Sequence, residues 1–313
     1  MPAVKEIKRR IKSVNNIKKI TKAMEMVAAA KMRRAVETVT KTRPYAELCW
    51  QTLLNVATNI PAQTRPLHPL LERHNLVKKI AVVLITSNRG LCGGFNSVLL
   101  NKVKSFLSQL DQKVEVDFIL WGRKGATVQR WGYNIAAVFT KEDLINETKE
   151  VGPVAAFLIE NFQAKNYNQI ILAYTDFINP LKQVPRLKQL LPLDIEADKY
   201  LGQVTMSLAA ESTNNDIIQP TSKRGGKAIY LFEPSPETVL EEVLPRLIEI
   251  QLFQALLESS ASEHSARMGA MRQATEAAEG LVDELNLSYN KARQAAITQE
   301  IAEISAGANA LAQ

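Results

Sequence analysis

A glycine-rich loop, "ITSNRGLCGGFN" at residues 85–96, has the residue types that could hold a phosphate group. It follows the apolar run "KKIAVVL" and precedes a stretch with helical spacing, which is where nucleotide-binding folds place a phosphate loop. Its glycines, Gly90, Gly93 and Gly94, are spaced G-x-x-G-G instead of G-x-G-x-x-G, and no Gly-Lys-Ser/Thr follows them. The spacing favours a structural turn, while a nucleotide-binding α/β enzyme that uses this Gly90–Gly94 loop stays an alternative.

Cysteines and histidines predict no further chemistry. The chain has two cysteines, Cys49 and Cys92, which are too few for a disulfide framework and lack the spacing of a metal site. Its three histidines, at positions 68, 74 and 264, are too scattered to suggest a zinc site or a catalytic dyad. We therefore expect no catalytic residue, no bound metal and no cofactor.

Charge is distributed unevenly along the chain, whose net charge is +7. Residues 1–43 carry thirteen Lys or Arg against three Glu, whereas residues 236–313 carry five against twelve Asp or Glu. A basic coiled-coil protein that binds nucleic acid is a third hypothesis, but the first 43 residues hold no aromatic side chain that could stack on bases. We expect no nucleic-acid partner; the basic face either is solvated or meets acidic loops of a partner protein.

Two long amphipathic helices should flank the part of the chain that contains the glycine-rich loop. Apolar residues spaced by three and four predict a helix over residues 1–57, with a kink at Pro44, and a second helix over residues 235–313, bent or delayed by Pro245. The first apolar stripe must face a protein and comprises Ile7, Ile11, Val14, Ile17, Ile20, Met24, Val27 and Ala28 to Met32. Because the two helices carry opposite charge, they should form an antiparallel coiled coil in which the second outruns the first.

Between these helices the pattern changes to buried strands that alternate with helical stretches. The strands are expected in "KKIAVVLITS", "VEVDFILWG", "YNIAAVFT" and "NQIILAYTDF". This alternation predicts a Rossmann-like α/β domain over residues 77–193 with a mostly parallel sheet. A polar segment, residues 194–227, should be an inserted hairpin or loop, and residues 228–234 a strand that returns to the domain.

The chain should not enter a membrane. No apolar run approaches the roughly twenty residues that a bilayer requires, and the start "MPAVKEIKRRIK" lacks the apolar core of a signal peptide. We therefore expect a cytosolic location without direct insertion into a bilayer.

Three stretches carry a resemblance to a known family: "IKSVNNIKKITKAMEMVAAAKMRRA" near the start, "SNRGLCGGFN" in the middle and "ITQEIAEISAGANA" at the end. In this order they resemble the gamma subunit of the rotary F-type ATP synthase. The resemblance implies a central rotor shaft inside a ring of three alpha and three beta subunits, with its α/β domain on the membrane c ring beside the epsilon subunit. It also implies that the chain is not catalytic by itself and is peripheral to the cytoplasmic face of a bacterial plasma membrane, or to a thylakoid membrane.

The same resemblance implies two groups of contact residues. Those expected to contact the alpha and beta subunits are Arg267, Gln294, Thr298, Glu300, Met24, Lys31, Arg33 and Arg34. Those expected to contact the c ring and the epsilon subunit are Tyr230, Phe232 and Glu233, in the segment "IYLFEP". The insertion at residues 194–227 contains no cysteine, so thiol regulation of the kind found in chloroplast relatives is not expected.

Overall fold

The computed structural model describes six stretches of the chain, residues 2–59, 68–72, 77–111, 113–142, 150–193 and 236–311. The expected insertion at 194–227 and the returning strand at 228–234, with Tyr230, Phe232 and Glu233, lie outside the described residues. The chain divides into two compact units. The helical-pair unit comprises residues 1–30 and 267–313, and the sheet unit comprises residues 31–266.

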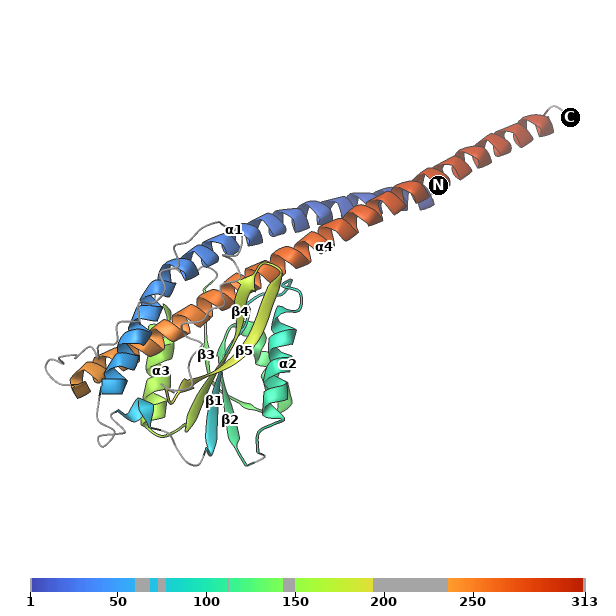
Figure 1. Ribbon diagram of the computed structural model, residues 1–313. Helices are drawn as coiled ribbons and strands as arrows, with labels where there is room; N and C mark the ends of the chain where they lie inside the picture. The colour runs from blue at the N-terminus through green and yellow to red at the C-terminus, as the bar shows by residue number, and fades with distance from the viewer. Residues whose placement is uncertain are drawn as a thin grey trace. The chain divides into compact units, whose positions relative to one another are not determined.

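Two long helices form the ends of the chain (Figure 1). Helix α1 runs from Pro2 to Asn59 with Pro44 inside it, and helix α4 runs from Pro236 to Leu311 with Pro245 inside it. Both helices contribute to both units. Within the described part of the chain, every helix has too little uninterrupted apolar length to form a membrane span.

The sheet unit contains a five-stranded sheet with strand order β3-β2-β1-β4-β5. Its strands are β1 (Lys79–Ile85), β2 (Glu115–Trp121), β3 (Asn134–Phe139), β4 (Gln169–Asn179) and β5 (Lys182–Leu191). The first four strands are parallel to one another, and β5 pairs antiparallel with β4. The predicted fold class, a helix pair plus an α/β domain with a mostly parallel sheet, is confirmed (Figure 1).

Two strands differ from the sequence-based prediction. Strand β5 was not predicted, because Pro185 and three basic side chains interrupt its apolar pattern. Strand β3 was expected to be buried, but its residues alternate between exposed and partly buried, and Val138 is 63% exposed. Among the described residues, both strands lie at the edges of the sheet, which are less enclosed than its centre and so tolerate polar side chains and proline.

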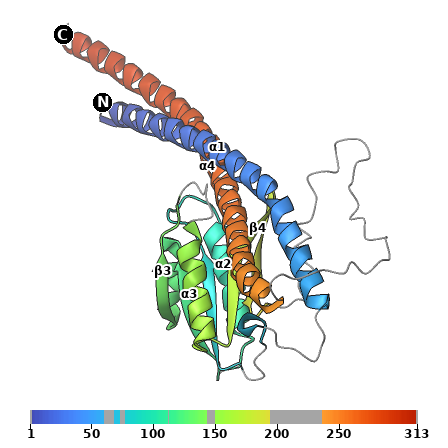
Figure 2. The same cartoon turned by 90° about the vertical axis from the view of Figure 1, so that its left-hand side faces the viewer.

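The sheet is buried on both faces by helices (Figure 2). Alternate residues of β1 enter different cores: Ala81, Val83 and Ile85 pack on the side of α3 and α4, whereas Ile80, Val82 and Leu84 pack on the side of α2. Helix α2 spans Phe95–Leu107, α3 spans Gly152–Gln163, and the 3₁₀ helix η3 spans Arg123–Trp131. Burial on both faces explains why the central strands are almost wholly apolar.

The helical-pair unit is an antiparallel pair. Thr275 of α4 donates a hydrogen bond to Thr21 of α1 at 2.8 Å, and Lys18 pairs with Glu279 at 2.8 Å, so residue numbers rise on one helix as they fall on the other. Ala28, at 2% exposure, is the most buried apolar residue of this seam. A small side chain there allows the two backbones to approach closely.

Candidate functional site

The glycine-rich loop between β1 and α2 is closed by its own polar groups. The Asn96 side chain accepts a hydrogen bond from the Ser87 amide at 3.1 Å and donates one to the Ser87 hydroxyl at 2.7 Å. That hydroxyl in turn donates to the carbonyl of Arg89 at 2.8 Å. Leu91 and Gly93 turn the chain with positive φ angles of 62° and 54°. The loop is therefore a turn held by the side chains of Ser87 and Asn96, as its glycine spacing predicted.

The loop is also held against the end of β2. The Thr86 hydroxyl donates to the carbonyl of Gly122 at 3.1 Å, and the Thr86 amide donates to the carbonyl of Trp121 at 2.9 Å. Gly122 has a φ of 119°, and a Cβ at this position would lie 2.2 Å from the Thr86 carbonyl oxygen. This contact leaves room only for glycine at the point where the ends of two strands meet.

In doubly wound sheets, ligands bind beyond the carboxyl ends of the strands where the strand order reverses. Here that point lies between β1 and β4, and helix α4 of the same unit crosses it. Ser262 donates to the carbonyl of Thr175 at 3.2 Å, Ser265 donates to the carbonyl of Pro180 at 2.7 Å, and Lys141 pairs with Glu263 at 2.6 Å. The crevice beside this pair has no space for a water molecule. A helix of the chain fills the position that a nucleotide would occupy, so this geometry does not favour the nucleotide-enzyme alternative.

The apolar stripe of α1 is only partly covered. Ile7, Ile11, Val14 and Met24 are partly buried, whereas Ile17, Ile20 and Val27 are between 53% and 59% exposed. The stripe was expected to face a protein, and within this unit one partner helix covers only a narrow seam of it. The rest of the stripe is an uncovered apolar surface beside exposed basic residues.

The four residues expected to hold the shaft do not form one site. Arg267 is partly buried, whereas Gln294, Thr298 and Glu300 are exposed. Because a helix rises about 1.5 Å per residue, Arg267 lies roughly 40 Å along α4 from Gln294. At about 100° per residue, Gln294 and Thr298 share one face, and Glu300 lies roughly a third of a turn or more away from both. These residues therefore lie at two levels of α4 and on more than one of its faces.

The other four predicted contact residues lie on α1. Met24 is partly buried in the helical-pair unit. In the sheet unit, Lys31 is partly buried, and Arg33 and Arg34 are exposed. The predicted electrostatic match between the two ends of the chain occurs at Lys18, whose hydrogen bond and charge hold the pKa of Glu279 below its ordinary value.

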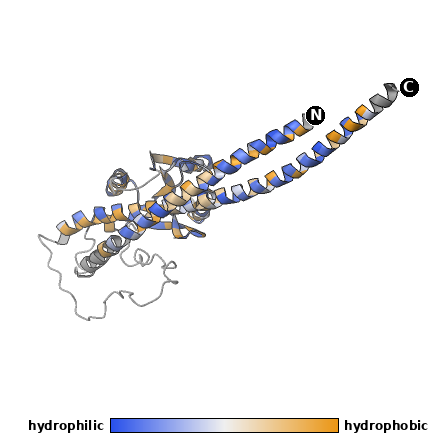
Figure 3. Ribbon diagram, turned by 90° about the horizontal axis from the view of Figure 1, so that it is seen from above, coloured by the Kyte–Doolittle hydropathy of each residue, from blue (hydrophilic) through white to orange (hydrophobic). Residues whose placement is uncertain are grey.

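Sequence reasoning missed an apolar ridge at the end of α4. Ile297, Ile301 and Ile304 are 47%, 62% and 73% exposed. At about 100° per residue they lie within roughly 60° of one another, with Gln294 and Thr298 on one side of the ridge and Glu300 on the other. The signal was their spacing of three and four residues, which was read as a helix and not as a contact surface. Figure 3 shows that apolar residues recur along α4 toward its C-terminal end.

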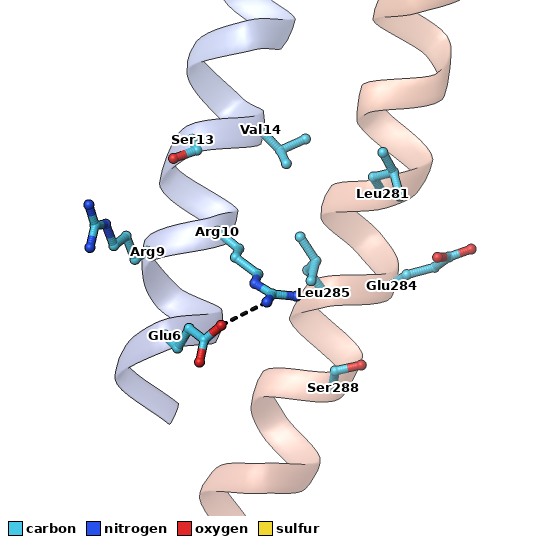
Figure 4. Close-up of a pocket in the computed structure, with 9 residues that line it drawn as sticks. All are labelled: Glu6, Arg9, Arg10, Ser13, Val14, Leu281, Glu284, Leu285 and Ser288. Atoms are coloured by element: carbon cyan, nitrogen blue, oxygen red, sulfur yellow. Dashed lines mark hydrogen bonds and ion pairs between the residues drawn. The ribbon is translucent and has the colours of Figure 1, made fainter. Parts of the chain in front are cut away.

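A second missed feature is an open cleft between the two helices (Figure 4). Its volume is about 690 Å³, and Val14, Leu281 and Leu285 supply its apolar lining. Arg10, which pairs with Glu6 at 2.7 Å, lies at its rim. The cleft shows that the two helices are not tightly packed at this level.

The contacts between the two helices show which residue of α4 lies opposite the start of α1. Since Thr21 lies opposite Thr275, and both helices rise by the same amount per residue, Pro2 should lie level with about residue 294 of α4. Residues 297–305 of α4 are all exposed. The second helix therefore outruns the first, as its length predicted, and Thr298 and Glu300 lie on the unpaired portion (Figure 1).

Comparison with known proteins agrees with this architecture. A family model described as ATP synthase matches residues 3–311. The ATP synthase gamma chains of Chloroflexus aurantiacus and Heliobacterium modesticaldum are 41% and 40% identical over 313 and 315 residues. These alignments cover 99% of this chain in both cases, and 99% and 100% of the respective relatives.

Two solved structures have the same fold. A chain of the Euglena gracilis mitochondrial ATP synthase, from a structure of OSCP, F1 and the c ring, is 18% identical with a TM-score of 0.64 and covers 99% of this chain and 95% of its own length. A chain of the Tetrahymena thermophila mitochondrial ATP synthase, from a structure of its central stalk and c ring, is 24% identical with a TM-score of 0.58. The match covers 82% of this chain and 99% of that chain. With a family match over nearly every residue and relatives of about the same length, the chain belongs to the ATP synthase gamma chain family.

Proposed function

We propose that this chain is the central rotor shaft of a proton-translocating F-type ATP synthase. It transmits torque from the membrane c ring to the catalytic beta subunits during ATP synthesis, and in reverse during hydrolysis. It has no catalytic activity alone and works as a peripheral subunit at the cytoplasmic face of a bacterial plasma membrane or at a thylakoid membrane. Its partners are three alpha and three beta subunits, the epsilon subunit and the c ring.

The observation that carries this proposal is the exposed apolar surface of the helical-pair unit. Ile20 of α1 is 59% exposed, and Ile301 of α4 is 62% exposed on the portion that has passed the start of α1. Isolated exposed apolar residues are ordinary, but a ridge of three at helical spacing is typical of a protein contact surface. An unpaired helix end with such a ridge suits a shaft enclosed by other subunits.

The shaft would act by changing which conformation each surrounding subunit adopts. A stiff, asymmetric rod that turns inside three identical catalytic subunits contacts each one differently, and so shifts each between states of different nucleotide affinity. We propose that Arg267, Gln294, Thr298 and Glu300 hold the shaft at defined angles through hydrogen bonds that form and break. Met24, Lys31, Arg33 and Arg34 would add contacts to the alpha and beta subunits.

The sheet unit would be the foot of the rotor. We propose that Tyr230, Phe232 and Glu233 contact the c ring and the epsilon subunit, as the resemblance of "IYLFEP" to the family segment implies. The runner-up function, a nucleotide-binding enzyme, would need the loop at residues 86–94 to open. The hydrogen bonds between Ser87 and Asn96 oppose that opening.

ATP synthesis in membrane vesicles tests the proposal. Thr298 is exposed and its hydroxyl bonds only its own helix, to the carbonyl of Gln294 at 3.0 Å, in the contacts seen here. Thr298→Val and Gln294→Leu should therefore leave the helix intact. If each loses a hydrogen bond to a charged or polar group of a partner, worth roughly 1.5–3 kcal/mol, ATP synthesis per assembled complex should fall about tenfold or more.

A matched control is Thr40→Val, because the exposed Thr40 makes the same bond within its helix, to the carbonyl of Val36 at 2.9 Å. This variant should synthesise ATP at the wild-type rate. Wild-type rates in the Gln294 and Thr298 variants and in their combination would remove these residues from the proposed contact. Failure of the wild-type chain to support any ATP synthesis in the assembled complex would overturn the function itself.

A further inference from the structure

A buried ion pair joins α4 to the sheet. The Lys141 ammonium lies 2.6 Å from the Glu263 carboxylate, and the two side chains are only 3% and 8% exposed. Lys141 follows β3 and Glu263 lies in α4, so 122 positions of sequence separate them. Because each charge would be costly to bury alone, the pair requires both segments to stay together.

The backbone of Lys141 is fixed in turn to two other strand ends. The Asn88 side chain, which follows β1, donates to the carbonyl of Lys141. Its oxygen accepts from the amide of Arg123, which follows β2, at 3.4 Å. Glu142 and His264 line the same crevice as the ion pair. The pair is therefore anchored to the loops after three parallel strands.

Serines of α4 complete the attachment on the other side. Ser262 donates to the main-chain carbonyl of Thr175, in the second half of β4, and Ser265 donates to that of Pro180, just beyond the strand. Gln183 of β5 also donates to the Ser265 hydroxyl, at 3.3 Å. None of these bonds is needed to form the helix, because each joins α4 to a different element. Together they reach all the strand ends around the point where the strand order reverses.

From Leu240 to Leu257, α4 packs on the sheet unit mainly through apolar side chains, although Arg246 also hydrogen-bonds to Tyr45 of α1. Apolar attraction is non-directional, so such contacts resist separation more than they resist turning or sliding of a helix about its own axis. Charge-assisted hydrogen bonds depend on distance and angle, so they fix both the axial position and the rotation of the helix. The polar cluster around Lys141 and Glu263 can thus resist torque in a way that the apolar core cannot.

We propose that Lys141 and Glu263, supported by Ser262 and Ser265, are positioning residues that lock α4 to the sheet unit against torque. The position that binds ligands in similar sheets would serve here as a mechanical joint. This inference rests on the proposed function, because it requires that torque enters through the sheet unit and leaves through α4. It concerns transmission of rotation, not the chemistry in the beta subunits.

The experiment uses the assembled complex in sealed vesicles, with ATP hydrolysis and the resulting proton gradient measured per complex. Lys141→Met leaves the Glu263 charge buried without its partner. We expect hydrolysis to continue while the gradient sustained at a given hydrolysis rate falls roughly two- to thirty-fold, the range found when contacts that couple distant sites are removed. Lys41→Met is the control, since Lys41 pairs with Glu37 at 2.7 Å within one helix and both are exposed; it should change nothing.

A second variant distinguishes a role of the ion pair in transmitting torque from a role in stabilising the fold. Replacing both charges, as Lys141→Met with Glu263→Met, removes the buried unpaired charge, so folding and assembly should recover to wild-type levels. If the pair only stabilises the fold, coupling recovers as well; if it locks the helix, the sustained gradient stays low. Wild-type coupling in this assembled double variant would overturn the inference. Absence of coupling in the wild-type complex would instead overturn the proposed function.

Discussion

At the scale of single residues, Asp117 of β2 organises the amino-terminal end of the parallel strands, at the opposite end of the sheet from the glycine-rich loop. Its carboxylate lies 3.0 Å from the Lys79 ammonium and accepts hydrogen bonds from Asn134 at 3.0 Å and Tyr167 at 3.1 Å. Burial alone would raise the pKa of Asp117, but the hydrogen bonds from Asn134, Lys79 and Tyr167 outweigh it, so the pKa lies below its ordinary value. Burial and the nearby carboxylate raise the pKa of Tyr167 to about 12.

The Asp117 network predicts a pH-dependent stability. A carboxyl group with a lowered pKa in the folded state contributes stability above its unfolded pKa, and this stability is lost as pH falls through the folded pKa. Asp117→Asn should therefore destabilise the sheet unit by about 1–3 kcal/mol at pH 7, and the difference from wild type should shrink below about pH 4. Urea unfolding followed by tryptophan fluorescence, at pH 3 to 7, measures this difference.

Glu115→Gln is the control for that prediction, because Glu115 is also near Lys79, at 3.7 Å, but its side chain is 76% exposed. Its effect should stay below about 1 kcal/mol. A destabilisation by Asp117→Asn that stays constant from pH 7 to pH 3 would contradict a role for the ionised carboxylate.

Gly122 allows a steric prediction. Gly122→Ala would place a Cβ 2.2 Å from the Thr86 carbonyl oxygen in a backbone conformation that disfavours side chains, with a φ of 119°. We expect a loss of more than about 3 kcal/mol in the free energy of unfolding. Gly132→Ala separates the two causes, since Gly132 also has a positive φ, of 84°, but no atom within 4 Å of its Cβ position. Thermal unfolding measures both variants. The free energy of unfolding should fall by only about 1–2 kcal/mol in Gly132→Ala. Equal losses in Gly122→Ala and Gly132→Ala would contradict the clash.

At the scale of elements, the seam of the helical-pair unit combines small apolar residues with one buried polar contact. Thr275 is 7% exposed, and its hydroxyl lies 2.8 Å from the Thr21 hydroxyl and 2.9 Å from the Met271 carbonyl. Apolar side chains can pack at several registers along a helix pair, whereas a polar pair is satisfied at one. The two threonines therefore fix how far α1 and α4 slide past each other.

Substitution of these threonines tests the register. Thr275→Val keeps the shape but removes the cross-helix hydrogen bond, and should cost about 0.5–1.5 kcal/mol. The double variant Thr21→Val with Thr275→Val should regain part of that stability, because no unpaired hydroxyl remains at the seam. Since the two helices can then slide, the pairing of Lys18 with Glu279 should weaken. Hydrogen exchange of the full chain measures the stability of the helices. NMR titration of Glu279 reports the pairing, and an unchanged Glu279 pKa in the double variant would contradict the register role.

At the scale of the whole molecule, both long helices belong to both units, so neither unit is an independent segment of the chain. The side chains of Ser87 and Asn96 hold the glycine-rich loop closed, and α4 occupies the usual ligand position of the sheet unit. Under the proposed function, the molecule acts through its contact surfaces with other subunits. Its activity should therefore appear only in assembly.

Nucleotide titration of the purified chain tests this expectation. ATP should bind with a dissociation constant weaker than about 1 mM, corresponding to roughly 4 kcal/mol, and hydrolysis should not exceed a buffer blank. Isothermal titration calorimetry measures the binding, with Ser87→Ala as the matched loop variant. Saturable binding at micromolar ATP that Ser87→Ala weakens would favour the nucleotide-enzyme alternative.

The sequence by itself determined the features that depend on local spacing. Helical periodicity predicted the two long helices, their opposite charges predicted antiparallel pairing, and the glycine spacing predicted that residues 90–94 form a structural turn. The central strands were recognisable because burial on both faces demands unbroken apolar runs, as in β1 (Lys79–Ile85). The three family stretches were recognisable because they are specific over a long range of residues.

Tertiary structure alone decided the features that depend on residues far apart in the sequence. Lys141 and Glu263 carry no local signal of pairing, and only the packing of α4 across the strand ends brings them within 2.6 Å. The exposure of Ile20 likewise follows from the width of one partner helix and not from the apolar stripe to which it belongs. Periodicity reports which face of a helix is apolar, but how much of that face is covered depends on the size and position of whatever packs against it.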